Sequence, residues 1–222
     1  MIKTGGGSFL LDAGVRIEKL INEINLNDLD FAFISHNHQD HSKYRQKLEK
    51  SGVFVLDGAV NREMYENRKI GKFKPNYRTW VVPVEHGKTA CGALIVNNSD
   101  TNELILYATD FSLCRTKLYD WKFTSVIVEC NYIESMMNES ITKSLDDMLI
   151  AKYKRQFNTH MGLEGLIMFL RTLDLKRCSE IILVHKSSDP RISNAQVMGE
   201  TIKKEFKKKV GVCLNEGGID WF

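Results

Sequence analysis

Short apolar runs separated by polar turns recur along the whole chain, and each predicts a buried or half-buried strand. The predicted strands cover residues 8–14 (ending in a turn), 29–34, 53–56, 80–86, 92–96, 103–112, 125–132, 180–185, 210–215 and 219–222. Helical spacing and charged composition predict helices over residues 15–24, 43–50, 61–69, 134–137, 163–173 and 193–209. The glycines at residues 5–7 predict a flexible start. Strands and helices are therefore both expected.

The strand predicted at 29–34 ends in a dense group of metal-capable side chains, Ser35-His36-Asn37-His38-Gln39-Asp40-His41-Ser42. Neutral imidazole is the commonest metal ligand, and carboxylate oxygen suits Zn, Mn and Fe. The alternate spacing directs His36 and His38 to the same side of a loop, while Asp40 and His41 can reach a second ion. A polar loop that is histidine-rich by chance is the alternative, and the spacing disfavours it. The stretch predicts a metal site.

This His-x-His-x-Asp-His stretch matches the signature of the metallo-β-lactamase superfamily. The resemblance implies an α/β fold, a four-layer αβ/βα sandwich, formed by one domain over residues 1–222. Asp110 and His185 lie too close in sequence for a β-CASP insertion, so a minimal form is expected. The stretches at 129–132 (Glu-Cys-Asn-Tyr) and 158–162 (Asn-Thr-His-Met-Gly) resemble the YycJ-type branch and its phage relatives.

Members of the superfamily usually bind two metal ions, and the resemblance assigns the ligands. The first ion would take His36, His38 and His86, the second Asp40, His41 and His185, and Asp110 would bridge the two. A ligand set of nitrogen and oxygen permits Zn or Mn. Asp12, in Leu-Asp-Ala-Gly, would accept a hydrogen bond from a ligating histidine and orient it. A simple helix N-cap is an equal alternative for Asp12.

The resemblance also implies hydrolysis of phosphodiester bonds by a water molecule that two metal ions activate. Asp40 has a second, catalytic role in this interpretation, because its carboxylate could orient the attacking water. His160 would donate a proton to the leaving oxygen or bind a phosphate oxygen. A purely structural His160 is the alternative.

A basic and aromatic segment at residues 68–80 suggests a nucleic-acid substrate, because cations hold phosphates and aromatic rings stack on bases. Lys72, Lys74 and Arg78 are the candidate substrate contacts. A solvated loop anchored by its aromatic residues is the alternative. Residues 67–80 could instead cover the site of a second copy in a homodimer. For the lysines at 203–209, favourable contact with the dipole of the last helix is the preferred explanation.

Three functions remain open: a nuclease acting on DNA or RNA, a cyclic-nucleotide phosphodiesterase of the phage anti-defence type, and a binding protein with a structural metal site. A net charge of +3 does not discriminate among them. The 43% hydrophobic and 27% charged composition is that of an ordinary globular protein, without a membrane span or signal peptide. Five widely spaced cysteines favour reduced thiols in a cytosol. With the resemblance to the YycJ-type branch and its phage relatives, this implies the cytoplasm of a bacterium or a phage-infected host.

Overall fold

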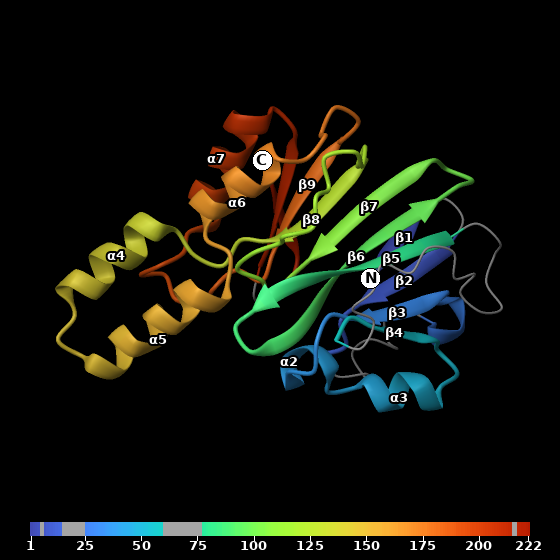
Figure 1. The fold of residues 1–222 in the computed structure, drawn as a ribbon, viewed down its shortest axis with the longest axis horizontal. Coiled ribbons are helices and arrows are strands. Elements are labelled where there is room, and N and C mark those ends of the chain that lie inside the picture. The colour runs from blue at the N-terminus through green and yellow to red at the C-terminus, as the bar shows by residue number, and fades with distance from the viewer. Residues whose placement is uncertain (5–6, 15–24, 60–76, 215–216) are drawn as a thin grey trace. The chain divides into compact units, whose positions relative to one another are not determined.

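The computed structural model describes residues 1–4, 7–14, 25–59, 77–214 and 217–222 (Figure 1). These residues divide between two compact units. The first unit is Met1–Val84 with Lys88–Leu104, and the second is Glu85–Gly87 with Ile105–Phe222. The helices predicted at 15–24 and 61–69, and the candidate contacts Lys72 and Lys74, lie outside the described residues.

A four-stranded sheet with the order β1-β2-β3-β4 forms the first unit's core. Its strands are β1 (Ile2–Thr4), β2 (Gly7–Leu11), β3 (Phe31–Ile34) and β4 (Val55–Asp57). All four residues of β3 are buried, as the apolar run predicts. The expectation of a flexible start at residues 5–7 was wrong for Gly7, which begins β2 and pairs with Thr4 of β1; residues 5 and 6 lie outside the described residues.

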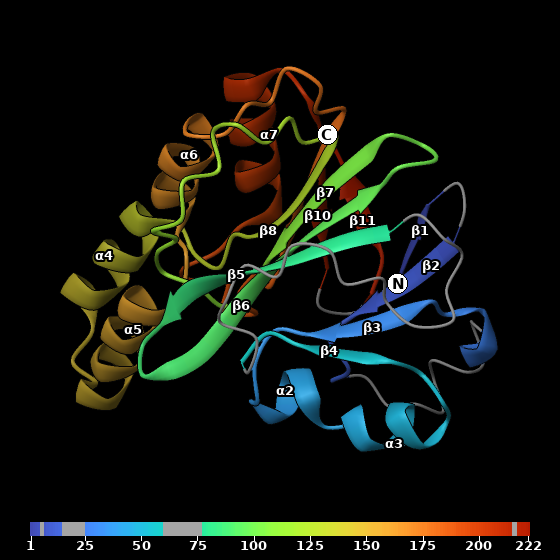
Figure 2. The same cartoon turned by 45° about the vertical axis from the view of Figure 1, so that its right-hand side comes forward.

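The metal-capable stretch after β3 is only partly a loop. A short 3-10 helix, η1 (Leu26–Asp28), precedes β3, and the helices α2 (Gln39–Ser42) and α3 (Arg45–Lys50) follow it. Both α2 and α3 lie beside β3 and β4 in the two views (Figures 1 and 2). Asp40 and His41 therefore lie on a helix, whereas the sequence predicted a loop.

A second sheet has seven strands in the order β11-β10-β9-β8-β7-β6-β5. The strands are β5 (Tyr77–His86), β6 (Thr89–Asn98), β7 (Glu103–Ala108), β8 (Ser125–Glu129), β9 (Glu180–Val184), β10 (Lys209–Cys213) and β11 (Ile219–Trp221). Strands β7 to β10 are parallel to one another, and β11 is antiparallel to β10. Carboxyl ends of parallel strands meet at one edge of a sheet, so residues that follow β7, β8 and β9 come together.

Four helices belong to the second unit: α4 (Glu134–Lys143), α5 (Asp147–Thr159), α6 (Leu163–Arg171) and α7 (Ala195–Phe206). Helix α7 packs on β10 and contacts α6, while α4 and α5 form a hairpin (Figures 1 and 2). The prediction that Leu163, Leu166 and Leu170 form a buried helix face is confirmed. No helix within the described ranges is both long enough and apolar enough to cross a membrane.

Three parts of the helix prediction need correction. Helix α4 runs from Glu134 to Lys143, whereas the prediction ended it at Met137. Helix α5 was not predicted, because its composition is largely polar and Tyr153 is its only buried residue. The last helix ends at Phe206, whereas the prediction extended it to Lys209. Lys207 adopts a left-handed conformation (φ 54°) that ends the helix, and Lys209 already begins β10.

A buried tyrosine links α5 to the loop that precedes α7. The hydroxyl of Tyr153 donates a hydrogen bond to Asp189 at 2.8 Å, and the guanidinium of Arg191 donates to the same carboxylate at 2.8 and 2.9 Å. The hydrogen bond from Arg191 is the main reason that the pKa of Asp189 lies below its usual range. Burial, together with the carboxylate, raises the pKa of Tyr153 to about 12.

We expect Asp189→Asn to lower the free energy of unfolding at neutral pH by about 2 kcal/mol, a typical value for hydrogen bonds to a charged group. The pKa of Asp189 is depressed in the folded protein, so its stabilisation is present above the unfolded-state pKa of about 4. The difference between wild type and variant should shrink as the pH falls through the folded-state pKa. Urea denaturation over a pH series measures it, with the exposed Asp120→Asn as control. Equal midpoints at neutral pH would contradict the prediction.

Candidate metal centre

Asp12 organises the histidine-rich stretch of the first unit. It directly follows β2, and because β2 pairs in parallel with β3, Asp12 lies beside Ser35 at the same edge. Its carboxylate accepts hydrogen bonds from the Ser35 backbone N–H at 2.7 Å and from His41 Nδ1 at 2.7 Å. A carboxylate can only accept, so His41 carries its proton on Nδ1 and presents Nε2 as the ligand atom. Nε2 lies 3.5 Å from an oxygen of Asp40.

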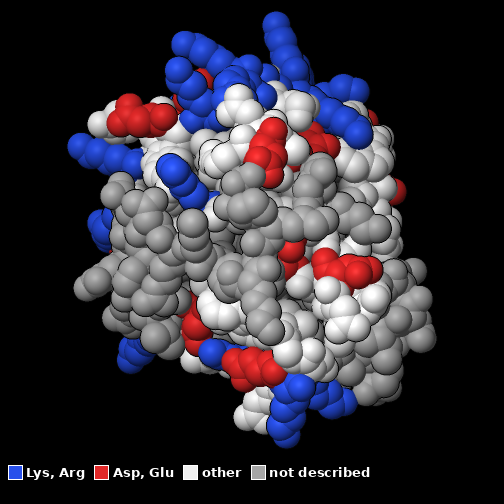
Figure 3. Space-filling model, turned by 90° about the vertical axis from the view of Figure 1, so that its right-hand side faces the viewer, with Lys and Arg blue, Asp and Glu red and all other residues white. Residues whose placement is uncertain are grey.

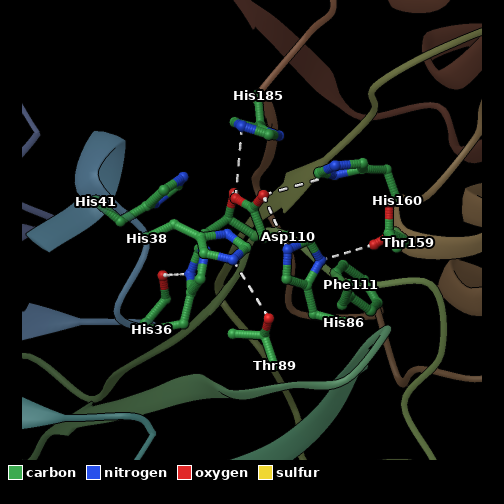
Figure 4. A network of polar contacts seen from close by, with 12 residues as sticks. His36, His38, His41, His86, Thr89, Asp110, Phe111, Thr159, His160 and His185 are labelled. Atoms are coloured by element: carbon green, nitrogen blue, oxygen red, sulfur yellow. Dashed lines mark hydrogen bonds and ion pairs between the residues drawn. The ribbon is translucent and has the colours of Figure 1, made fainter. Parts of the chain in front are cut away.

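The tautomer of His36 follows from its neighbour. The Ser35 hydroxyl donates to Asp12, so its oxygen accepts from His36 Nδ1 at 3.0 Å (Figure 4). His36 then presents Nε2. In His38, Nε2 lies 3.3 Å from the hydroxyl of Thr89, a group that can either donate or accept. The ring centres of His36 and His38 are 4.4 Å apart.

The glycine of Leu-Asp-Ala-Gly allows this stretch to pack closely on the turn after β2. A Cβ atom on Gly14 would lie 1.5 Å from the carbonyl oxygen of Asp40, so a larger residue would displace α2. The adjacent Ala13 N–H donates to the carbonyl of His41 at 2.7 Å. The motif thus places both a carboxylate and a close backbone contact beneath the metal-capable side chains.

In the second unit, polar side chains gather at the ends of parallel strands. Glu129 ends β8, His185 directly follows β9, and Asp110 lies just beyond β7. Glu129 pairs in register with Val184, which places it next to His185. Single ligand atoms of Asp110, Glu129, His160 and His185 all lie within 4.8 Å of one another, a spacing that could hold a metal ion.

His160 comes from farther along the chain, at the C-cap of α5. Two backbone hydrogen bonds of 2.8 Å return this segment to the end of β8: Asn131 N–H to the carbonyl of Met161, and Leu163 N–H to the carbonyl of Tyr132. His160 therefore belongs to the strand-end cluster although it lies on no strand.

The two carboxylate oxygens of Asp110 face different histidines. Oδ1 lies 4.0 Å from His86 Nε2 and 3.5 Å from His160 Nδ1, while Oδ2 lies 3.5 Å from His185 Nε2 (Figure 4). The residue is 2% exposed and has a left-handed backbone (φ 50°), which is uncommon outside glycine and asparagine. A carboxylate placed in this way can offer one oxygen to each of two ions.

Glu129 is a site residue that the sequence analysis missed. It is completely buried, and its Oε1 accepts hydrogen bonds from His160 Nδ1 at 2.7 Å and His185 Nδ1 at 2.8 Å. Burial by itself raises the pKa of Glu129, but the hydrogen bonds from these two histidines outweigh it, and the net pKa is lowered. The sequence did contain a signal for this site residue, because a charged side chain directly follows the apolar run 126–128.

His86 is held by a backbone carbonyl. It ends β5, and its Nδ1 donates to the carbonyl of Thr159 at 2.9 Å (Figure 4). Because a carbonyl cannot donate, His86 presents Nε2, the atom that faces Asp110.

Comparison with known proteins identifies the fold. No protein-family model matches the chain. Its structure is similar to the metallo-β-lactamase fold protein YhfI from Bacillus subtilis, with a TM-score of 0.64, 17% identity, and coverage of 99% of this chain and 89% of YhfI. The chain has the metallo-β-lactamase fold. The short form of human tRNase Z shares this fold, with a TM-score of 0.59, 10% identity, and coverage of 100% of this chain and 90% of the human one.

The metallo-β-lactamase fold confirms the fold class expected from the His-x-His-x-Asp-His stretch, and no inserted domain separates Asp110 from His185 in the described chain. In sequence, the chain is 25% identical over 227 residues to Probable RNase MJ4 of Methanocaldococcus jannaschii. That match covers 82% of this chain and 52% of the relative, so the chain spans about half the relative's length.

The donor set of this metallo-β-lactamase fold suits divalent metal ions. In the second unit, the buried carboxylates of Asp110 and Glu129 lie among histidines. The two carboxylates bring negative charge into a buried site, and bound cations would balance it. Imidazole nitrogen and carboxylate oxygen suit Zn or Mn. The first unit's stretch offers the same donor types.

Of the three candidate substrate contacts, only Arg78 lies in the described residues. It is exposed near the start of β5, the strand that His86 ends. Lys72 and Lys74 stay predictions from the sequence.

Proposed function

We propose that this protein is a metal-dependent hydrolase that cleaves phosphodiester bonds in nucleic acid, and in RNA in particular. The observation that carries the proposal is the Asp110 carboxylate, which is buried at a strand-end edge with its two oxygens directed at different histidines. The names of Probable RNase MJ4 and of human tRNase Z support RNA as the substrate.

We further propose that the donors assigned from the order of the motifs hold two ions. One ion would be held by His36, His38 and His86, the other by Asp40, His41 and His185, with Asp110 shared. When bound, such ions supply Lewis acidity toward phosphoryl oxygen and make water a better nucleophile. Asp12 and Glu129 do not reach the ions in this assignment; they hold the ligating histidines in one tautomer.

Proton transfer is assigned to residues beside these ligands. The side chain of Asp40 is 70% exposed, so its carboxylate can accept a proton from the attacking water. His160 is held through Nδ1 by Glu129, which leaves Nε2 to carry a second proton to the leaving oxygen. In this scheme the hydrogen bond from Nδ1 to Glu129 fixes the orientation of the His160 ring.

Elemental analysis and substrate comparison test the proposed function together. We expect about two ions per chain, and metal-dependent cleavage of single-stranded RNA faster than that of single-stranded DNA, duplex DNA or cyclic mononucleotides. The assays would use protein loaded with Zn or with Mn, and chelator-treated protein as the control. Turnover confined to cyclic mononucleotides would replace the nuclease with a cyclic-nucleotide phosphodiesterase. Absence of bound metal and of any turnover would reject both.

A further inference from the structure

Five lysines gather at the end of α7 and directly after it. Lys203, Lys204, Lys207, Lys208 and Lys209 line an open groove of about 700 Å³, together with Glu200 and Phe222. Lys and Arg side chains gather along the upper edge of the face shown in Figure 3. Helix α7 also lies at the top of the view in Figure 1.

Local structure does not account for this concentration of positive charge. Only Lys203 and Lys204 lie in the last turn of α7, where cations stabilise the helix dipole. The other three lysines follow the helix, and Lys207 has the left-handed backbone that favours glycine. Among the described residues, none of the five forms an ion pair with a carboxylate. The nearby Glu205 is paired with Arg171 at 2.6 Å.

Two aromatic side chains lie beside these lysines. We call the five lysines, Lys203, Lys204, Lys207, Lys208 and Lys209, the α7 lysine group. The ring of Phe222 packs against α7 at Gly199, where a Cβ atom would lie 2.3 Å from it. Trp221 is 45% exposed on the edge strand β11, and the ammonium of Lys209 lies 3.7 Å from its ring centre. Unpaired cations beside an exposed aromatic ring are typical of surfaces that bind a nucleic-acid backbone and stack a base.

The register of the sheet places this group away from the strand-end cluster. Lys209 pairs with Glu180 at the start of β9, whereas His185 directly follows the end of that strand. At a rise of about 3.3 Å per residue, the five steps from Glu180 to His185 span about 16 Å. A nucleic-acid strand with a rise of about 3.4 Å per nucleotide needs roughly five nucleotides for that distance.

We propose that the α7 lysine group is a second contact surface for RNA, which binds the phosphate backbone of a stacked substrate strand about five nucleotides from the bond that is cleaved. The inference rests on the proposed function, because it assumes that RNA is cleaved at the strand-end cluster. It implies that long RNA gains affinity from this surface, while substrates shorter than about five nucleotides do not.

The test compares Lys204→Gln/Lys208→Gln with the control Lys47→Gln/Lys50→Gln, which removes the same charge from α3. Fluorescence anisotropy of metal-loaded protein would use a phosphorothioate RNA of about 20 nucleotides, which keeps its charge and resists hydrolysis. We expect the test variant to bind about tenfold more weakly, with a salt-dependence slope flatter by about 1.4, or about 0.7 per lost phosphate contact. Cleavage of a trinucleotide should be unchanged.

The outcomes separate this inference from the proposed function. If the variant binds long RNA with wild-type affinity and salt slope while RNA is still cleaved, the second surface is rejected and the proposed function stands. If the wild type cleaves no RNA, the proposed function fails. Wild-type binding to phosphatidylserine vesicles but not to RNA would reject the second surface as well. Weaker binding by the α3 control to the same degree would also reject it, because the effect would then be one of net charge.

Discussion

Asp110→Asn is expected to reduce kcat/KM for the proposed phosphodiester hydrolysis at least about a thousandfold, because several kcal/mol of transition-state stabilisation by the metal ions would be lost. It should also release at least one metal ion. The two oxygens of Asp110 face His86 and His160 on one side and His185 on the other. Asparagine keeps the shape and tolerates the left-handed backbone, but it replaces one anionic oxygen by an NH₂ group, which cannot bind a cation.

Metal content by elemental analysis and steady-state kinetics on RNA measure this effect. The exposed Asp120→Asn serves as control for the loss of one carboxylate, and circular dichroism checks that both variants fold. Retention of both ions in Asp110→Asn, with activity within tenfold of the wild type, would exclude a shared ligand at this position.

Glu129→Gln should weaken metal binding by about 10- to 100-fold, the usual cost of losing a group that orients ligands. Each carboxylate oxygen accepts from two donors: Oε1 from His160 and His185, and Oε2 from the backbone N–H groups of Phe111 at 2.9 Å and Met161 at 3.4 Å. Glutamine has one accepting oxygen. Either orientation of its amide therefore directs an NH₂ group at two N–H donors inside a fully buried site.

Competition with a chelating dye would give the metal affinity of this variant. Glu139→Gln is the matched control, since Glu139 is exposed on α4 and pairs only with Lys143 among the described residues. The rate of cleavage should fall as well, because His160 loses its acceptor. An unchanged metal affinity would show that Glu129 does not position the histidines.

The metal-capable residues could be predicted from the sequence because the end of a buried strand is visible as the end of an apolar run. An apolar run that stops at a histidine or aspartate marks a strand terminus, and the run before Ser35 and the run before His185 both became strands. The face of α6 was predicted for the same kind of reason, because apolar residues at helical spacing are buried together. The three-residue strand β1 and the largely polar helix α5, which has one buried residue, were missed.

The sequence by itself indicated a group of metal-capable side chains at strand ends, and its resemblance to the metallo-β-lactamase superfamily implied the class of fold. Only the tertiary structure decided which histidines accept or donate hydrogen bonds that fix their orientation, and which residues make those hydrogen bonds. Glu129 is an unremarkable strand-end acid until the register with Val184 and the hydrogen bond from Asn131 to Met161 place two histidines on it. The end of α7 depends likewise on β10, which takes Lys209 into the sheet. Strand register, and the hydrogen bonds that bring distant segments together, depend on residues far apart in sequence. No window of neighbouring residues encodes them.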